Sequence, residues 1–387
     1  MDRSLISAYY FCGIKENCIR RFIIFLGREA VFIREVEHLA ATILSYSAVI
    51  TKMRGMYGRL LTAENYELLM SMSRVGDIVR WLKENGGYAE TLKDISEASV
   101  HRSSLENAFH AALIVDAKKL SAMLGAKEKK MMALLMARVE IDILKRIIRS
   151  IYTGIPVPSQ VLQMDLSYSR QFDLFRCLEA KHFMQLLEAL RGTGYDQVLT
   201  PLVLREDIST FDMEEALDEY YFRRLKEGAK KYLSGTDLKA AENFWGSEID
   251  AQNILWTYRY KKYYHFSKEE TLRHLVPNKY KIRKEQLLRL ADSSVADFER
   301  VVAETRYSRL FANSRDVEWD RRVTDYLCRM YMRQIRRSAY NFTTIAAYLY
   351  LKEIDIRNII TIVEGVRYRI GPSEIRRYLI TGVDYGN

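Results

Sequence analysis

The tripeptide Glu-Ile-Asp occurs three times in this 387-residue chain, and its spacing is nearly constant. The copies lie at 140–142, 248–250 and 353–355, so the second follows the first by 108 residues and the third follows the second by 105. Self-similarity at a fixed period indicates a structural unit that is repeated along the chain. The sequence therefore predicts three similar units, which limits the fold to architectures built from three related parts.

Other features recur in the same order, although chance similarity among helical sequences is an alternative explanation. A tyrosine precedes each tripeptide by 52, 53 or 46 residues, namely Tyr88, Tyr195 and Tyr307. An amphipathic stretch begins between each tyrosine and its tripeptide, at Leu105, Leu217 and Val323. Prolines, which end helices, then follow the repeats. We place the repeats at 41–157, 158–277 and 278–387, with residues 1–40 outside them.

The spacing of apolar residues predicts helices throughout the repeats. Apolar residues follow the pattern of one helix face, as in Leu105, Phe109, Ala112 and Leu113, whereas strict alternation is scarce. The chain contains only five prolines, and none precedes Pro156. Long periodic runs, in which apolar residues recur at helical spacing, cover 127–152, 237–264 and 340–369, each long enough for about 37 Å of helix. The predicted fold is all-α, with one Glu-Ile-Asp tripeptide in the middle of each core helix.

Polar side chains of these core helices are candidates for packing or for contact with a partner. Asn253 and Asn358 follow isoleucines by four residues, so each amide shares a helix face with an apolar side chain and is expected to be partly buried. A buried amide needs hydrogen-bond partners, because an unpaired polar group costs about 1–3 kcal/mol. Lys145 takes this place in the first repeat.

The acidic residues of the tripeptides allow two interpretations. The glutamates either pair with basic residues of neighbouring helices and fix the packing, or they contact a partner protein directly. The sequence leaves both possibilities open. The candidate residues of the repeated motif are Glu140, Asp142, Glu248, Asp250, Asn253, Glu353, Asp355 and Asn358.

Signatures of catalysis are absent from the sequence. The segment Gly192-Thr193-Gly194 does not continue as a phosphate-binding loop, and no His-Glu-x-x-His occurs among the six histidines. The four cysteines form no Cys-x-x-Cys pair, which suits a reducing cytoplasm. No stretch approaches the roughly 18 uncharged residues of a membrane-spanning helix. We expect a protein that is not an enzyme, binds no cofactor or metal and has no transmembrane segment of its own.

Positive charge makes a basic helical nucleic-acid-binding protein the alternative. Sixty Lys and Arg residues against fifty Asp and Glu residues give a net charge of +10. Residues 258–265 read Tyr-Arg-Tyr-Lys-Lys-Tyr-Tyr-His, and cations interleaved with rings can bind phosphates and stack on bases. The same stretch ends the second core helix, where cations interact favourably with the helix dipole. We favour this second interpretation and expect no nucleic acid as a partner.

Three segments carry a resemblance to a known family. Two are core-helix stretches, 247–255 with Ser-Glu-Ile-Asp-Ala-Gln-Asn-Ile-Leu and 351–360 with Leu-Lys-Glu-Ile-Asp-Ile-Arg-Asn-Ile-Ile. The third, 46–69, contains Lys-Met-Arg-Gly-Met, Leu-Leu-Thr and Tyr-Glu-Leu-Leu, and its marker residues are Tyr46, Arg54, Leu60 and Leu61. From about Tyr46 to the C-terminus, the chain resembles the C/d subunit family of V-type and archaeal-type ATPases, whose first helix is similar to 46–69.

The resemblance implies a non-catalytic, all-helical protein whose three similar domains form a funnel with pseudo-threefold symmetry. Members of this family lie between the rotating axle of the ATP-hydrolysing head and the proteolipid ring of the membrane, and they pass torque between the two. The implied function is that of a rotor subunit for proton or sodium transport, peripheral on the cytoplasmic face of the membrane. Its partners would be the axle subunits, held in a socket, and the proteolipid ring, held by a wide face.

Residues 1–40 depart from the family pattern, because members typically begin close to the helix that Tyr46 matches. Either these residues form an additional helix, as Ile23, Phe25 and Phe32 among charges suggest, or translation starts later, at a codon such as that of Val36 or Leu44. We expect the remainder of the chain to fold without them.

Overall fold

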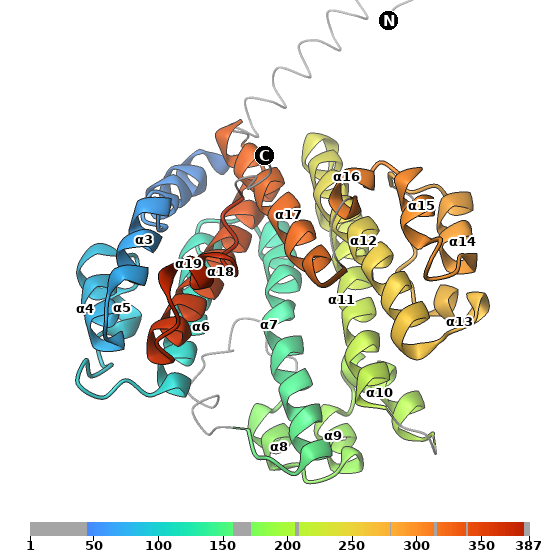
Figure 1. The fold of residues 1–387 in the computed structure, drawn as a ribbon, viewed down its shortest axis with the longest axis horizontal. Helices are drawn as coiled ribbons and strands as arrows, with labels where there is room; N and C mark the ends of the chain where they lie inside the picture. Colours follow the sequence, from blue (N-terminus) through green and yellow to red (C-terminus); the bar gives the residue numbers. More distant parts are fainter. Residues whose placement is uncertain are drawn as a thin grey trace, which may run out of the picture. The chain divides into compact units, whose positions relative to one another are not determined.

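The computed structural model describes residues 45–157, 172–205, 209–278, 280–312, 316–337 and 340–382. The described residues from Val49 onward belong to one compact unit. Every regular element in the described ranges is a helix, which confirms the all-α prediction (Figure 1). The expectations for residues 1–40 lie outside the described residues.

Helices of two lengths alternate in a fixed order, with three short helices followed by two long ones. The first series is α3 (Ala63–Ser71), α4 (Val75–Asn85), α5 (Ala89–Leu92), α6 (Arg102–Ser121) and α7 (Ala126–Thr153). The second is α8 (Leu174–Glu179), α9 (Phe183–Leu190), α10 (Gly194–Val203), α11 (Thr210–Tyr232) and α12 (Gly235–Arg259). The third is α14 (Lys284–Asp292), α15 (Phe298–Ala303), α16 (Ser308–Phe311), α17 (Trp319–Arg336) and α18 (Phe342–Arg367).

Five further elements of the described chain lie outside these series. A π-helix, η2 (Tyr260–Tyr264), and the helix α13 (Lys268–Arg273) follow α12, a 3-10 turn, η3 (Asp316–Glu318), precedes α17, and α19 (Pro372–Arg376) follows α18. Residues 45–57 are also helical. The order of short and long helices is compatible with three repeats, whose boundaries at 157 and 277 stay a prediction.

The three long periodic runs form the predicted core helices. α7, α12 with η2, and α18 begin and end within three residues of the expected ranges. α18 is buried on nearly all sides, as a helix that is apolar all round should be. α7 ends where Gly154 adopts a left-handed conformation with φ of 71°, which glycine tolerates without steric cost.

Long helices from different series pack directly against one another. α7 of the first series lies along α11 of the second (Figure 1), and α12 of the second series packs on α17 of the third. α18 also contacts α7, α12, α6 and the short helices α3 and α4. Helices that are far apart in the sequence therefore share one core.

Two asparagines make the same pair of hydrogen bonds, and both are buried as the sequence suggested. The Asn253 amide donates to the carbonyl of Val276 at 2.9 Å and accepts from its backbone N–H at 3.1 Å. Asn358 donates to the carbonyl of Ile380 at 2.7 Å and accepts from its N–H at 2.8 Å. Each amide thereby holds the chain that returns after its core helix, and no buried polar atom of either amide stays unpaired.

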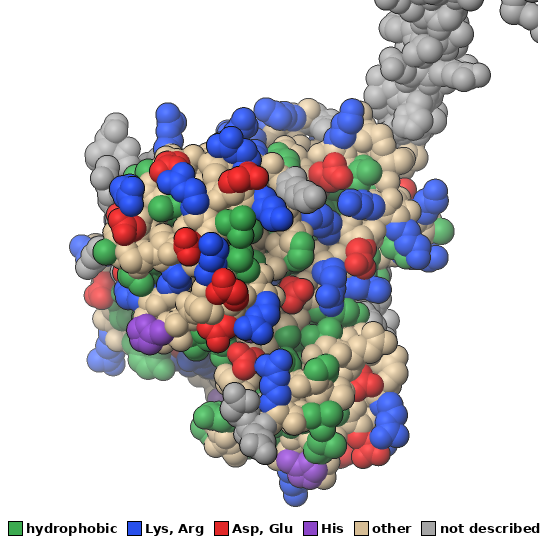
Figure 2. Space-filling view, turned by 90° about the vertical axis from the view of Figure 1, so that its right-hand side faces the viewer, with side chains coloured by type: hydrophobic (Ala, Val, Ile, Leu, Met, Phe, Trp, Pro, Cys, Tyr) green, Lys and Arg blue, Asp and Glu red, His purple; other side chains and the backbone are tan. Residues whose placement is uncertain are grey.

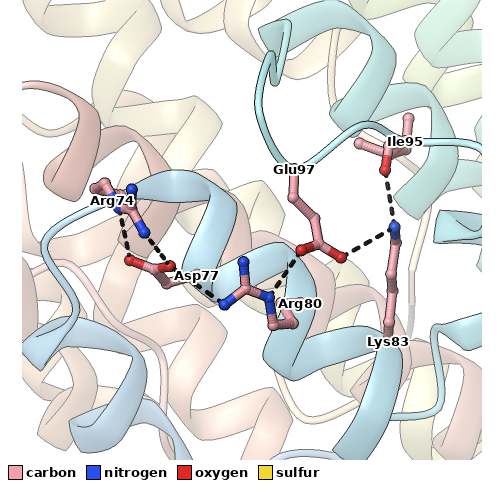
Figure 3. A network of polar contacts seen from close by, with 6 residues as sticks. All are labelled: Arg74, Asp77, Arg80, Lys83, Ile95 and Glu97. Carbon is pink, nitrogen blue, oxygen red and sulfur yellow. Dashed lines mark hydrogen bonds and ion pairs between the residues drawn. The ribbon is translucent and has the colours of Figure 1, made fainter.

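A polar network joins α4 to the segment that follows α5 (Figure 3). The Arg80 guanidinium donates to Glu97 at 2.8 Å, and the Lys83 ammonium donates to the carbonyl of Ile95 at 2.8 Å. The two segments approach so closely that a Cβ added at Gly76 would lie 2.2 Å from the backbone carbonyl oxygen of Glu97. This contact requires glycine at position 76.

Substitution of Gly76 tests that close approach. We expect Gly76→Ala to lower the free energy of unfolding by about 1–3 kcal/mol, because the added methyl group forces backbone apart. Denaturant unfolding measures the change. Gly55→Ala is the matched control, since its Cβ meets nothing within 4 Å; an equal loss in both variants would contradict the steric explanation.

Candidate functional site

The acids of the core helices are bound by the tyrosines that precede the repeated tripeptides. The tyrosine hydroxyl donates to a buried carboxylate in all three cases: Tyr195 to Glu140 at 2.8 Å, Tyr307 to Asp250 at 3.1 Å, and Tyr88 to Asp355 at 2.6 Å. Each tyrosine belongs to the helix series after the one that carries the acid, and the first series closes onto the last. The three bonds therefore form a cycle.

This pairing corrects the register of the first repeat. The tripeptide match equates Asp142 with Asp250 and Asp355, whereas the tyrosine contacts equate Glu140 with those two aspartates. Glu140 is fully buried and Asp142 is exposed. Two residues of helix turn through about 200°, so acids two positions apart face opposite sides. Equating Lys145 with the two asparagines is therefore also wrong.

Additional donors saturate the two aspartates. Asp250 accepts from the Asn278 side chain at 2.7 Å and from the backbone N–H groups of Lys281 and Ile282 at 2.8 and 3.0 Å. Burial raises the pKa of Asp250, and these donors oppose that rise. Because its oxygens are hydrogen-bonded, burial of this carboxylate costs less free energy than burial of an unpaired one.

Asp355 is surrounded by two tyrosines and a buried lysine. Tyr66 donates to it at 2.6 Å, and the Lys352 ammonium lies 3.4 Å from the centroid of the Tyr88 ring. Burial raises the pKa of Asp355, while the ammonium and the two hydroxyls act in the opposite direction. Burial also disfavours the charged form of Lys352 and so lowers the pKa of its ammonium group.

The marker residues of the first-helix match lie in different surroundings. Tyr46 is buried, whereas Arg54 is exposed and its guanidinium lies 5.8 Å from the centroid of the Tyr340 ring. Leu60 and Leu61 precede α3 and line a cavity of about 400 Å³ that also reaches Asp355. These residues are not brought together with Glu248 or Glu353.

A second cavity, of about 70 Å³, lies among six long helices. The shorter long helix of each series contributes one residue with a ring, and each core helix contributes a charged residue at one corresponding position. The first set is His110 of α6, Tyr221 of α11 and Tyr331 of α17; the second is Arg138 of α7, Glu248 of α12 and Glu353 of α18. We refer to it as the central cavity.

Arg138, Glu248 and Glu353 occupy corresponding positions, because each lies two residues before a tyrosine-bound acid. Arg138 pairs with Glu248 at 2.6 Å, and its guanidinium lies 5.0 Å from the centroid of the Tyr221 ring. Glu353 pairs at 3.4 Å with Arg357 of its own helix. The predicted pairing with a neighbouring helix is thus observed for Glu248, and it is wrong for Glu353, whose ion-pair partner is local.

Asp142 also lines the central cavity, and it has no hydrogen bond or ion pair with any described residue. Partial removal from bulk water, and then the Glu353 carboxylate, raise the pKa of Asp142 to about 6, although the side chain keeps contact with solvent. Burial also lowers the pKa of the His110 imidazole. The cavity therefore holds a carboxyl that is easily protonated and a histidine that stays neutral.

The basic stretch 258–265 is largely engaged within the protein. Lys262 forms an ion pair with Asp316, and Arg259 pairs with Asp320 at 2.5 Å. The Tyr264 ring stacks on Phe211 with centroids 4.1 Å apart. On the face that carries α13 to α15, basic and acidic side chains are interspersed (Figure 2). These contacts reduce the support for the nucleic-acid alternative.

The described ranges offer neither a cluster of metal ligands nor a membrane span. Within 45–382, outside the segments that the structure leaves undescribed, no three His, Cys, Asp or Glu side chains are grouped as a metal site would require. None of the helices described there combines the length and apolar character needed to cross a bilayer.

Removal of one tyrosine hydroxyl tests the cycle of carboxylate contacts. We expect Tyr195→Phe to lower the free energy of unfolding by about 1.5–3 kcal/mol, because a buried carboxylate loses a donor. Thermal or denaturant unfolding measures the loss. Tyr378→Phe, at a side chain that is 64% exposed, is the control and should leave stability unchanged.

The protonation of Asp142 gives a pH prediction. Its carboxyl should titrate near pH 6 in the folded protein, against about 3.9 in an unfolded chain. The folded state then binds the proton more tightly. The contribution of this group to folding stability is fully present below about pH 3.9 and is lost as the pH rises through 6. Carboxyl NMR on Glu353→Gln should show a lower pKa for Asp142; an unchanged titration would contradict the proximity of the two charges.

Known proteins resemble this chain over most of its length. The model of the family described as ATP synthase (C/AC39) subunit matches residues 49–378. The C subunit of the A-type ATP synthase of Archaeoglobus fulgidus is 22% identical over 344 residues, which cover 87% of this chain and 96% of the relative. Proteins of the same name from Pyrococcus furiosus and a Desulfurococcus species are 21% and 24% identical, over 86% of this chain and 89% of each relative. Since the family match spans most of the sequence, the chain belongs to the ATP synthase (C/AC39) subunit family, as a non-catalytic member.

Proposed function

We propose that this chain is a rotor subunit of a V/A-type ATPase, and that it couples the axle of the ATP-hydrolysing head to the proteolipid ring. It would lie on the cytoplasmic face of the membrane and serve proton or sodium transport. Membership in the family supports a non-catalytic ATPase subunit. The relatives are named as C subunits of A-type ATP synthases. The coupling role is the mechanical task that we propose for such a subunit.

The cycle of tyrosine–carboxylate bonds is the observation that carries this proposal. Tyr88 of the first series binds Asp355 of the third, so the first and last parts of the chain are joined as closely as consecutive ones. The division into repeats at 41–157, 158–277 and 278–387 is part of the proposal. A closed set of three units provides a central axis, which a component that turns with an axle requires.

Stiffness is the second requirement for transmitting torque, and the packing supports it. The long helices of each series contact partners from another series, and the buried polar groups that join them are hydrogen-bonded. Close-packed interiors have low compressibility and transmit strain. No bond is made or broken in such a task, so none of the residues described above needs a catalytic role.

Purification from membranes tests the association. Tagged full-length chain, taken from gently solubilised membranes, should bring down the catalytic head, the axle subunits and the proteolipid ring, as identified by mass spectrometry. Recovery of the chain alone, or with nucleic acid in a manner that falls steeply with salt, would contradict the proposal.

Coupling itself needs a functional measurement. Membranes from cells that lack this chain should retain ATP hydrolysis by the head and lose ATP-driven ion transport. Addition of the full-length chain should restore transport. Transport that proceeds normally without the chain would contradict a coupling role even if the complex still forms.

A further inference from the structure

We propose that the central cavity binds one guanidinium or ammonium group, presented by a basic side chain of the axle, with Glu353 and Asp142 as its counter-charges. The identity of the partner rests on the proposed function. The cavity, its charges and its rings are properties of this chain alone. A volume of about 70 Å³ suits the end of one side chain rather than a larger ligand.

The charged residues that line the cavity carry one more negative charge than positive. Two cations, Arg138 and Arg146, line it together with three acids, Asp142, Glu248 and Glu353. His110 is neutral near pH 7, because burial lowers its pKa. A single positive charge would complete the set, whereas an anion would add to the excess.

The three corresponding positions of the core helices show where that charge is missing. Arg138 and Glu248 compensate each other across α7 and α12. The third position holds Glu353. Its contact with Arg357 of the same helix is long, at 3.4 Å, and partly exposed, so this ion pair contributes little free energy. The side chain of Glu353 keeps 28% of its surface accessible, which leaves it available to an incoming cation.

The aromatic surroundings suit the same chemistry. Tyr221, Trp245, Tyr331 and Tyr350 line the cavity, and a cation over an aromatic face is stabilised by the ring quadrupole. Arg138 already demonstrates this arrangement, since its guanidinium lies over Tyr221 while it pairs with Glu248. Tyr350 and Glu353, three residues apart on α18, line the same cavity.

The state of Asp142 gives independent support. Burial raises the pKa of Asp142, and the Glu353 carboxylate and then Asp218 add to the rise, whereas Arg138 and Lys145 oppose it. The Asp142 and Glu353 carboxylates therefore repel each other when both are ionised. A bound cation would relieve this repulsion and lower the pKa of Asp142. Binding at pH values below about 6 should therefore release a proton, by linkage.

A small probe tests the cavity in the full-length chain without the partner. N-acetyl-arginine methylamide carries the guanidinium, and its citrulline counterpart has nearly the same size without the charge. We expect the arginine compound to bind at least tenfold more tightly, as measured by NMR titration, and to lower the pKa of Asp142. Equal affinity for the two compounds, or tighter binding of the corresponding glutamate compound, would overturn the proposal.

Two variants and one control localise the binding. Glu353→Gln and Asp142→Asn should each weaken the arginine compound about tenfold. Glu374→Gln, at an exposed carboxylate of α19 outside the cavity, should leave its affinity unchanged. Thermal melts check that all three variants are folded, and equal affinity in wild type and both cavity variants would overturn the assignment.

The probe titration and the purification from membranes can fail independently of each other. If the probe binds as expected and the tagged chain purifies without ATPase subunits, the cavity is a cation site and the coupling role fails. If the complex purifies and the probe does not bind, the coupling role stands and the cation site is refuted.

Discussion

A carboxylate buried in a helical core must be hydrogen-bonded, and in this chain each core helix obtains its donor from another helix series. Glu140, Asp250 and Asp355 are almost completely buried, and each accepts a bond from a tyrosine that arrives with the next series. In an isolated series, the buried acid would lack its tyrosine donor, and the tyrosine of that series would lack its carboxylate acceptor. The same bonds therefore satisfy the core and fix how neighbouring series pack.

Much of this fold could be predicted from periodicity. The long periodic runs became α7, α12 and α18, and the amphipathic stretches at Leu105 and Leu217 became buried faces of α6 and α11. The register of the first repeat could not be predicted, because an identical tripeptide was a stronger signal than the position of a single acid. The longer side chain of Glu140 fills the role of aspartate two residues away, and only the contact with Tyr195 reveals it.

The central cavity could not be predicted from the sequence, for a related reason. Arg138, Tyr221 and Trp245 are ordinary residues of amphipathic helices, and nothing in their local pattern indicates that they share a cavity. Their correspondence becomes visible once the positions are counted from the tyrosine-bound acids.

The closure of the first series onto the last has a consequence for the order of the chain. Tyr88 binds Asp355, Arg376 pairs with Glu67, and α19 contacts α3. Because no series is terminal in space, the contacts do not depend on which one is synthesised first. A circularly permuted gene that begins with the second series would therefore keep the contacts between the first and third series within one continuous chain.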